Sequence, residues 1–256
     1  MNLSIYQKDI FHNYKSNSQR ARILSENWFS RFMYCPCCLN ERIIPYPNNQ
    51  KVSDFFCESC GNNFQLKSSK LPFSKRIVDG EYNTMLSYIK SGNSPNFFIL
   101  HYSNTQWTVK SLSMIPKFFV TYSMLEKRKP LSGNARRAGW MGCNFLLDHL
   151  PKEGKIPIII NEKLESRKKV HKMWNKMSFL SNRRPELRGW TSDVLKIVQE
   201  QRDVFNLTDI YCHEKYFKKL HPENNNIRAK IRQQLQILRD NNLVKFKGKG
   251  IYEVIK

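Results

Sequence analysis

The stretch from Val52 to Lys67, "VSDFFCESCGNNFQLK", decides the fold of the N-terminal half of this chain. Two short runs typical of β-strands, "VSDFF" and "NFQLK", lie on either side of a tight Cys-x-x-Cys turn. The sequence therefore predicts a β-hairpin whose turn offers two thiolates to a metal ion. Polar residues that could carry chemistry are distributed over both strands of this hairpin.

A second Cys-x-x-Cys pair precedes the hairpin. Eighteen residues separate Cys35 and Cys38 from Cys57 and Cys60, which is the spacing of two-knuckle structural zinc sites. Four thiolates close the coordination sphere, so a zinc ion held there is expected to be structural and not catalytic. Cys37 lies outside this register and is expected to be a spare thiol.

Asp54, Gln65 and Lys67 carry the second chemical pattern of the hairpin. Side chains two residues apart point to the same face of a strand, so Gln65 and Lys67 can both face Asp54 on the neighbouring strand. Nucleases that use Mg²⁺ place a metal-binding Asp on one strand and a metal-binding group two residues before a Lys on the next. Gln65 stands where this arrangement expects an acid. The alternative is an ordinary zinc-ribbon hairpin with polar residues on its open face.

Helical and strand-like patterns alternate around the hairpin. Apolar residues at helical spacing predict a helix over 17–32, and "DGEYNTMLSYIKSG" predicts a second helix that ends at Gly92. Further strands are expected around Ile43, over 96–103 and over 107–115. This order of helix, strands, helix and strands is that of an α/β domain. The section 116–154 is expected to consist mainly of loops.

The pattern of the sequence changes to a succession of amphipathic helices after "NRRPELRG" (182–189), which we interpret as a linker. Three amphipathic helices are predicted next, in "WTSDVLKIVQEQ", "NLTDIYCHEKYFKKL" and "NNNIRAKIRQQLQILRDNN", with Thr191 or Ser192 capping the first. The closing "LVKFKGKGIYEVIK" predicts a hairpin around "KGKG". Three helices and a hairpin make a winged helix-turn-helix. We therefore predict one domain over 1–182 and a DNA-binding domain over 183–256.

The third helix of this module is expected to enter the major groove of DNA. Its apolar stripe of Ile227, Ile231, Leu235 and Leu238 is expected to face the core. The other positions then offer candidates for bases and phosphates: Asn226, Arg228, Lys230, Arg232, Gln233 and Gln236. The wing offers three lysines for phosphates, namely Lys245, Lys247 and Lys249. The alternative is a solvated helix face without a groove partner.

The charge of the chain favours a polyanionic partner. It has 43 Lys and Arg against 21 Asp and Glu, which gives a net charge of +22. Each phosphate that such a surface neutralises releases condensed counterions, so nucleic acid is a more natural partner than a neutral ligand. A basic, soluble surface without such a partner is the alternative. A content of 40% hydrophobic residues excludes wholesale disorder.

No sequence feature predicts a membrane or an export route. The longest apolar runs, such as "IPIII" (156–160), are far shorter than the ~18 residues that span a bilayer. The N-terminal stretch has no apolar core or cleavage site of a signal peptide. An odd number of cysteines, seven, favours reduced thiols and metal binding over disulfides, and Cys143 and Cys212 are expected in cores. A cytoplasmic protein is expected.

Several motifs in a fixed order resemble the DpnI family of methyl-directed restriction endonucleases. They are "YKSNSQRARILSENW", the two Cys-x-x-Cys pairs, "DFFCESC", "LKS", "SPNFFIL", "ARRAGWMGCN", "RGWT" and "IRQQLQILRDNNLVKFKGKG". The resemblance covers nearly the whole chain. It implies a PD-(D/E)xK nuclease domain with an embedded structural zinc site and a C-terminal winged helix. It also implies Mg²⁺-dependent cleavage of double-stranded DNA at GATC sites with N6-methylated adenine, recognised by both domains.

The resemblance assigns roles to individual residues. Asp54 is implied as a metal ligand and Lys67 as the catalytic lysine, whereas Gln65 departs from the family's Glu and removes one negative charge. Hard cations prefer carboxylates, so metal affinity is expected to fall. The family's methyl-sensing Trp falls on Trp140, in a basic, Gly-flanked loop with Arg136 and Arg137. Without the resemblance, a core position would be the default for this Trp.

Two functions follow from these patterns. The first is a monomeric type II site-specific deoxyribonuclease that restricts adenine-methylated foreign DNA. The second is a non-cleaving methyl-DNA-binding protein or regulator in which Gln65 has impaired the site. Because Asp54 and Lys67 are both retained, the sequence favours the enzyme.

Overall fold

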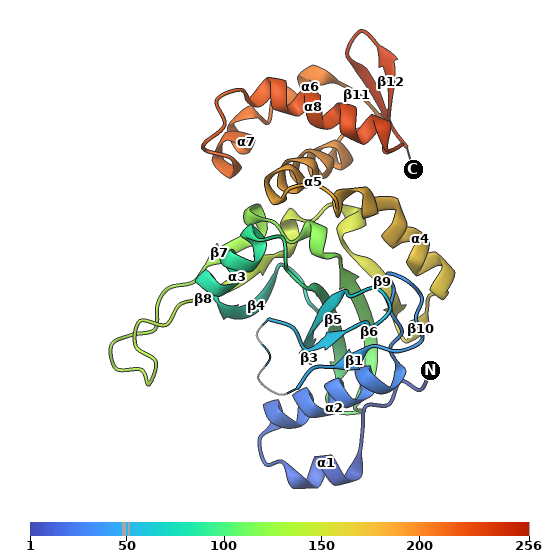
Figure 1. Cartoon of the computed structure of the whole chain (residues 1–256), viewed down its shortest axis with the longest axis vertical. Helices are drawn as coiled ribbons and strands as arrows, with labels where there is room; N and C mark the ends of the chain where they lie inside the picture. The colour runs from blue at the N-terminus through green and yellow to red at the C-terminus, as the bar shows by residue number, and fades with distance from the viewer. Residues whose placement is uncertain (48–49, 51, 256) are drawn as a thin grey trace.

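The computed structural model describes residues 1–47, 50 and 52–255, which form an α/β body and a smaller helical module above it in Figure 1. The body is built around a mixed seven-stranded sheet in the order β1-β2-β3-β5-β6-β9-β10. Its strands are β1 (Ile44–Pro45), β2 (Phe55–Phe56), β3 (Asn63–Ser69), β5 (Asn96–Ser103), β6 (Thr108–Ile115), β9 (Ile156–Ile160) and β10 (Lys163–Leu164). β3 and β5 run parallel, and the other neighbours are antiparallel.

The core of the body lies between the sheet and helix α2 (Asn17–Phe32), which has the bounds that the apolar spacing predicts. Phe29 of this helix packs against Phe98 of β5, with ring centroids 4.7 Å apart. Residues 96–100 are all buried, as expected for a central strand covered on both faces. A hydrogen bond of 3.1 Å between Ser25 and Ser68 fixes α2 to β3, the strand of the quoted stretch.

A second, three-stranded sheet in the order β4-β8-β7 flanks the first. Its strands are β4 (Arg76–Glu81), β7 (Leu125–Lys127) and β8 (Gly142–Leu146). The sequence patterns predicted neither β4 nor β8, and helix α3 (Tyr82–Lys90) begins later than expected. The Glu81 carboxylate accepts hydrogen bonds from the amides of Asn83 and Thr84 and so caps α3, while the residues before it pair with β8.

The connection between β7 and β8 projects from the body as a long arm (Figure 1). Shorter elements complete the body: α1 (Lys8–Asn13), α4 (Arg167–Met177), and the 3₁₀ turns Lys117–Phe119, Tyr122–Met124, Leu147–His149, Lys152–Gly154 and Ser178–Leu180. Within the described residues, no helix combines the length and the apolar character that crossing a bilayer requires.

The C-terminal module has the helices and the wing that the sequence predicts, with different bounds. Its elements are α5 (Pro185–Glu200), β11 (Val204–Asn206), α6 (Leu207–Tyr211), α7 (Glu214–Leu220), α8 (Ile227–Asp240), β12 (Val244–Gly248) and β13 (Ile251–Val254). The second predicted helix is therefore two helices, and β11 adds a third strand to the wing in the order β11-β13-β12.

The stretch interpreted as a linker is the beginning of α5, and this interpretation was wrong. Pro185 occupies the first turn of the helix, where its missing amide hydrogen costs nothing. Thr191 and Ser192, predicted as caps, lie buried in the helix interior. The Thr191 hydroxyl donates to the carbonyl of Leu187 and contacts the side chain of Gln234 at 2.7 Å, so packing against α8 accommodates it.

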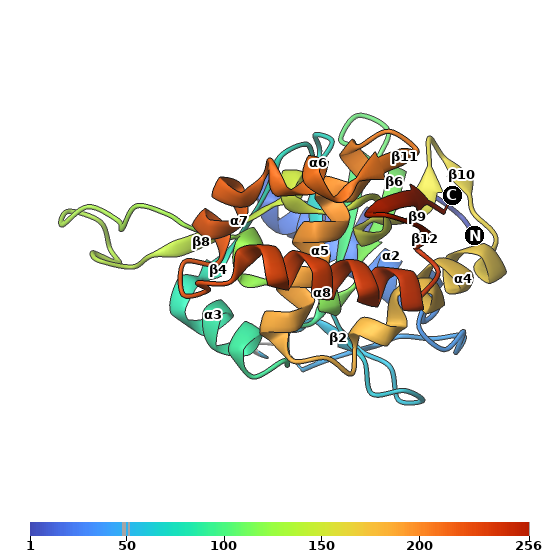
Figure 2. The same ribbon diagram turned by 90° about the horizontal axis from the view of Figure 1, so that it is seen from above.

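Helix α5 lies between α8 and the α/β body in both views (Figures 1 and 2). Its Asp193 is 1% exposed and accepts a hydrogen bond of 2.9 Å from Ser123 of the body. The other carboxylate oxygen is 2.8 Å from Nε2 of His221, whose ring stacks on Trp190. A buried carboxylate with two partners of this kind joins the module to the body.

Candidate functional site

The four cysteines of the two Cys-x-x-Cys pairs meet at one point of the body. The sulfur atoms of Cys35 and Cys60 are 3.6 Å apart, as are those of Cys38 and Cys57, and all four lie within 4.8 Å of one another. Four thiolates around a tetrahedral zinc ion stand about 3.8 Å from each other, given a Zn–S bond of about 2.3 Å. The cluster is therefore consistent with a structural zinc site, and Cys37 is not one of the four.

The two pairs form knuckles with the same backbone geometry. The amide of Leu39 donates to the carbonyl of Cys35 at 2.9 Å, and the amide of Gly61 donates to the carbonyl of Cys57 at 2.8 Å. Leu39 and Gly61 both have a positive φ, of 64° and 65°. Each chain then turns so that its two thiols converge on the same point.

The residue after each turn is an asparagine that the sequence patterns did not single out. The side-chain amide of Asn62 donates a hydrogen bond to the sulfur of Cys60 at 3.3 Å. The side-chain amide of Asn40 donates one to the sulfur of Cys57 at 3.7 Å. Such bonds stabilise a thiolate and orient a metal ligand. The repeat Cys-x-x-Cys-x-Asn, present in both knuckles, is the signal that would have identified these two residues.

The surroundings of Cys57 favour its thiolate form. Burial acts to raise its pKa, but the backbone amides of Cys60 and Ser59 and the thiol of Cys38 favour the anion and lower the pKa to about 7. The thiolate is the form that binds a metal ion. Burial raises the pKa of Cys38 instead.

Asp54, just before β2, and Gln65 and Lys67, on β3, belong to the hairpin whose turn carries Cys57 and Cys60. The amide of Asp54 donates to the carbonyl of Phe64, which fixes the register of the two strands. In the other direction, Oδ2 of Asp54 accepts a hydrogen bond of 2.8 Å from the amide of Leu66. Leu66 lies between Gln65 and Lys67 on β3, so the carboxylate lies next to both of them.

Burial dominates the electrostatics of Asp54 and raises the pKa of its carboxyl group. The backbone amide of Leu66 and the positive charges of Lys67 and Arg22 oppose this rise only in part. Arg22 lies on α2, where it also forms an ion pair of 2.8 Å with Glu26. The carboxylate is thus held in a polar, partly dehydrated position, which is the environment of a metal ligand.

Gln65 and Lys67 differ in how their polar atoms are satisfied. The side-chain oxygen of Gln65 is buried and has no hydrogen-bond partner among the described residues. The ammonium group of Lys67 contacts Oδ1 of Asp79 on β4. A buried acceptor without a donor is costly, and a divalent cation is one group that would satisfy it. The oxygens of Gln65 and Asp54 are therefore the candidate ligands for a divalent cation on this hairpin.

A groove of about 410 Å³ opens at Asp54, which is the one residue of the three that lines it among the described residues. It is bounded by α2 and by the segment before the hairpin, and its lining includes Arg22, Glu26, Tyr46 and Ser53. Sequence patterns indicated neither Arg22 nor Asp79 as part of the site. Both come from elements outside the hairpin, and only the packing of α2 and β4 brings them near it.

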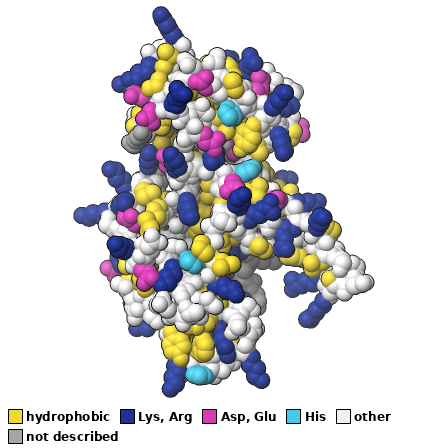
Figure 3. Space-filling view, turned by 180° about the vertical axis from the view of Figure 1, so that it is seen from behind, with side chains coloured by type: hydrophobic (Ala, Val, Ile, Leu, Met, Phe, Trp, Pro, Cys, Tyr) yellow, Lys and Arg dark blue, Asp and Glu magenta, His cyan; other side chains and the backbone are white. Residues whose placement is uncertain are grey.

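Trp140 lies at the base of the arm. The backbone of Leu131 pairs with those of Trp140 and Gly139, so the arm is closed at its base. A Cβ atom on Gly142 would come within 2.9 Å of the Trp140 ring, so the absence of a side chain at Gly142 makes room for the outer edge of this ring. The ring is half-buried, whereas Arg136 and Arg137 are exposed. Lys and Arg side chains line the arm and the face shown in Figure 3.

Helix α8 separates its residues as the apolar stripe predicts. The four stripe residues, Ile227, Ile231, Leu235 and Leu238, are buried. The predicted contact residues lie on the other faces, with Lys230 half-buried and the rest exposed, namely Asn226, Arg228, Arg232, Gln233 and Gln236. Lys245, Lys247 and Lys249 are exposed on the wing.

Some of these candidates already have partners within the protein. Arg228 forms an ion pair of 2.9 Å with Glu214, and Arg232 donates to the hydroxyl of Tyr211 at 2.9 Å. Lys247 pairs with Glu253. Contacts with DNA by these three side chains would have to replace or share the existing partners.

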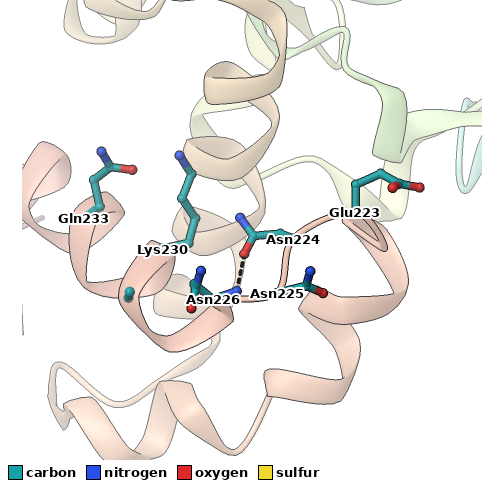
Figure 4. A pocket seen from close by; sticks show the side chains of 7 residues that line it. Glu223, Asn224, Asn225, Asn226, Lys230 and Gln233 are labelled. Carbon is teal, nitrogen blue, oxygen red and sulfur yellow. Dashed lines mark hydrogen bonds between the residues drawn. The ribbon is translucent and has the colours of Figure 1, made fainter.

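The N-terminal end of α8 borders a hollow of about 540 Å³. Figure 4 shows that amide side chains from the preceding loop and from α8 surround it, together with Lys230: Asn224, Asn225, Asn226 and Gln233. Burial lowers the pKa of Lys230, and no ion pair holds its ammonium group among the described residues. Amides and an unpaired ammonium are groups that bind base edges and phosphates.

Family profiles cover both parts of the chain. The profile of the Dam-replacing family, DpnI, matches residues 1–183, and that of the Dam-replacing HTH domain, the DpnI C-terminal domain, matches residues 186–254. The α/β body with its mixed sheet and four-cysteine cluster, followed by the helical module, is the arrangement that these two matches describe. The chain is therefore a member of the Dam-replacing, or DpnI, family.

Proposed function

We propose that this protein is a Mg²⁺-dependent endonuclease that cleaves double-stranded DNA at GATC sites with N6-methylated adenine. One observation carries the proposal: the side-chain oxygen of Gln65, buried and without a hydrogen-bond partner among the described residues, lies on the same hairpin as the Asp54 carboxylate and the Lys67 ammonium. A neutral zinc-ribbon hairpin has no need of such a group. The family membership and the net charge of +22 support the same function.

Each residue of the hairpin would have a separate role in hydrolysis. Asp54 and Gln65 would hold the metal through one oxygen each. A bound Mg²⁺ supplies an activated water and stabilises the charge that develops on the phosphate. Lys67, next to both, would orient the attacking water and donate to the scissile phosphate. The four-cysteine cluster, which includes the Cys57–Cys60 turn between β2 and β3, would keep these strands in register through a structural zinc ion.

Recognition would use both parts of the chain. Trp140 would contact the adenine methyl groups with its flat, apolar ring, while Arg136 and Arg137 bind the backbone nearby. The polar faces of α8 and the wing would bind a second copy of the methylated site. We assign these roles to the domains 1–182 and 183–256, acting as a monomer whose role is restriction of methylated foreign DNA.

Substitutions of Asp54 and Lys67 test the site. Asp54→Ala and Lys67→Ala are expected to abolish cleavage of methylated plasmid, because one removes a metal ligand and the other a charge at the reacting phosphate. Binding of methylated DNA, measured by mobility shift, should be unchanged. Asp148→Ala and Lys70→Ala, which alter exposed residues of the same types outside the site, are the matched controls. Normal cleavage by Asp54→Ala or Lys67→Ala would show that the substituted residue is not part of the cleavage site.

A second function has one observation in its favour. Gln65 lacks the negative charge of a carboxylate, and a weakened metal site would leave a methyl-DNA-binding protein without cleavage. The enzyme is favoured because the chain keeps both Asp54 and Lys67, and a reader of methylated DNA has no use for this pair. The same cleavage and binding assays separate the two functions.

A further inference from the structure

Asp79 is a buried carboxylate with a single ionic partner. Its side chain is 2% exposed, and Oδ1 contacts the Lys67 ammonium, whose side chain is 19% exposed. The second oxygen, Oδ2, is buried and has no hydrogen-bond partner among the described residues. A carboxylate this deep requires a compensating charge, so Asp79 and Lys67 depend on each other.

The backbone of β4 directs this side chain to the site. Asp79 lies opposite Cys143 of β8, and the register shifts between Asp79 and Glu81. An irregularity of this kind re-aims the side chains at its position. Through it, a residue of the second sheet reaches Lys67 on β3 of the central sheet.

The charges of the cluster show what Asp79 adds. Asp54, Gln65 and Lys67 together have no net charge, whereas an acid in place of Gln65 would give −1. Asp79 restores a formal charge of −1 to the group. Without it, the ammonium of Lys67 would have Asp54 as its counterion, since the two already interact. A metal ion would then have to compete with Lys67 for its main ligand.

We propose that Asp79 is a positioning residue of the cleavage site, which holds Lys67 away from Asp54 and supplies the negative charge that Gln65 lacks. This inference rests on the proposed nuclease function. Asp79 acts through Lys67, which its Oδ1 contacts, and through the negative charge that it adds near the metal position.

Metal binding without turnover is the direct test. Ca²⁺ is titrated by calorimetry into the full-length protein bound to a methylated GATC duplex, for the native chain, Asp79→Asn and Glu126→Gln. Glu126 lies on the same second sheet but pairs with Arg76, so it is the matched control. Asp79→Asn is expected to weaken Ca²⁺ binding about tenfold or more and to slow single-turnover cleavage by about 10- to 100-fold, at unchanged affinity for DNA.

Thermal unfolding of the same proteins tests the link to Lys67 independently of cleavage. Lys67→Met leaves the Asp79 charge buried and unpaired, so it should lower the melting temperature. Adding Asp79→Asn to it should restore part of that loss. Native Ca²⁺ affinity in Asp79→Asn, or strictly additive losses in the double variant, would overturn the inference. A native protein that cleaves no DNA would overturn the proposed function instead, while the Ca²⁺ and unfolding results would still decide the role of Asp79.

Discussion

At the scale of single residues, Gln65 is the residue at which the proposed metal site departs from a pair of carboxylates. Its side-chain oxygen is buried and has no hydrogen-bond partner in the part of the chain that the structure describes, and it precedes Leu66, whose amide binds Asp54. An amide oxygen binds a hard cation without contributing charge. We therefore expect a Gln at this position to lower the affinity for the metal ion. The geometry of the hairpin should not change, because it does not depend on the charge of this side chain.

Gln65→Glu is expected to lower the Mg²⁺ concentration needed for half-maximal cleavage, by about tenfold, since a second carboxylate strengthens attraction to the ion. Cleavage of methylated plasmid over a Mg²⁺ series measures this. Gln106→Glu, at an exposed turn remote from the hairpin, is the control. An unchanged Mg²⁺ dependence would mean that Gln65 is not a ligand.

Trp140→Ala is expected to reduce discrimination between methylated and unmethylated GATC duplexes by about 1–3 kcal/mol, the worth of one aromatic contact with a base. Competition binding with the two duplexes measures it. Leu131→Ala, at an exposed side chain of the same arm, should leave discrimination intact. Full discrimination by the Trp140 variant, with a lowered melting temperature, would make this ring purely structural.

At the scale of elements, the two cysteine knuckles are a repeated unit. Each has a hydrogen bond from the fifth residue to the first and an asparagine in sixth place, so the unit comprises more than its thiols. The side chains of Asn40 and Asn62 then serve the thiolates as outer-shell donors. The hairpin of β2 and β3 is held by this unit at its turn and by pairing with β5 along the length of β3.

Asn62→Ala is expected to weaken zinc binding about 10- to 100-fold, because the sulfur of Cys60 loses its amide donor. Competition with a zinc chelator, followed by metal release and by melting temperature, measures the change. Asn104→Ala, at an exposed turn, is the control. Equal zinc retention in both variants would contradict the role of the outer-shell donors.

The sequence predicted those elements whose pattern is local. Helix α2, strand β5 and the apolar stripe of α8 have strong periodicity, and their bounds or faces agree with the structure. Strands β4 and β8 were missed because each depends on pairing with the other across more than sixty residues of chain. The start of α5 was missed because Pro and Gly, which usually end helices, here lie in a helix stabilised by burial between two layers.

The same distinction applies to the site. The four cysteines and Asp54, Gln65 and Lys67 belong to one compact segment, and spacing alone brought them together. Arg22 and Asp79 come from α2 and β4, and their positions depend on tertiary packing that no local spacing records. Site residues that lie far apart in the sequence, such as these two, can be identified only from the tertiary structure.

At the scale of the whole molecule, the two parts of the chain share a buried polar contact. Asp193 of α5 accepts from Ser123 of the body and contacts His221 of the module, and the aromatic ring of Trp190 covers the histidine. Polar groups held in a dry contact favour one relative orientation, because a rotated module would leave them unpaired. The hairpin and α8 are thus held in one relative orientation by this contact.

Digestion of adenine-methylated and unmethylated plasmid, side by side, with Mg²⁺ and with EDTA, tests the central claim most directly. We predict cleavage of the methylated plasmid alone and its loss in EDTA, with Asp54→Ala as the inactive control. Binding of methylated DNA without any cleavage, over a full range of Mg²⁺ and Mn²⁺ concentrations, would contradict the claim and leave a methyl-DNA-binding protein with the architecture of a nuclease.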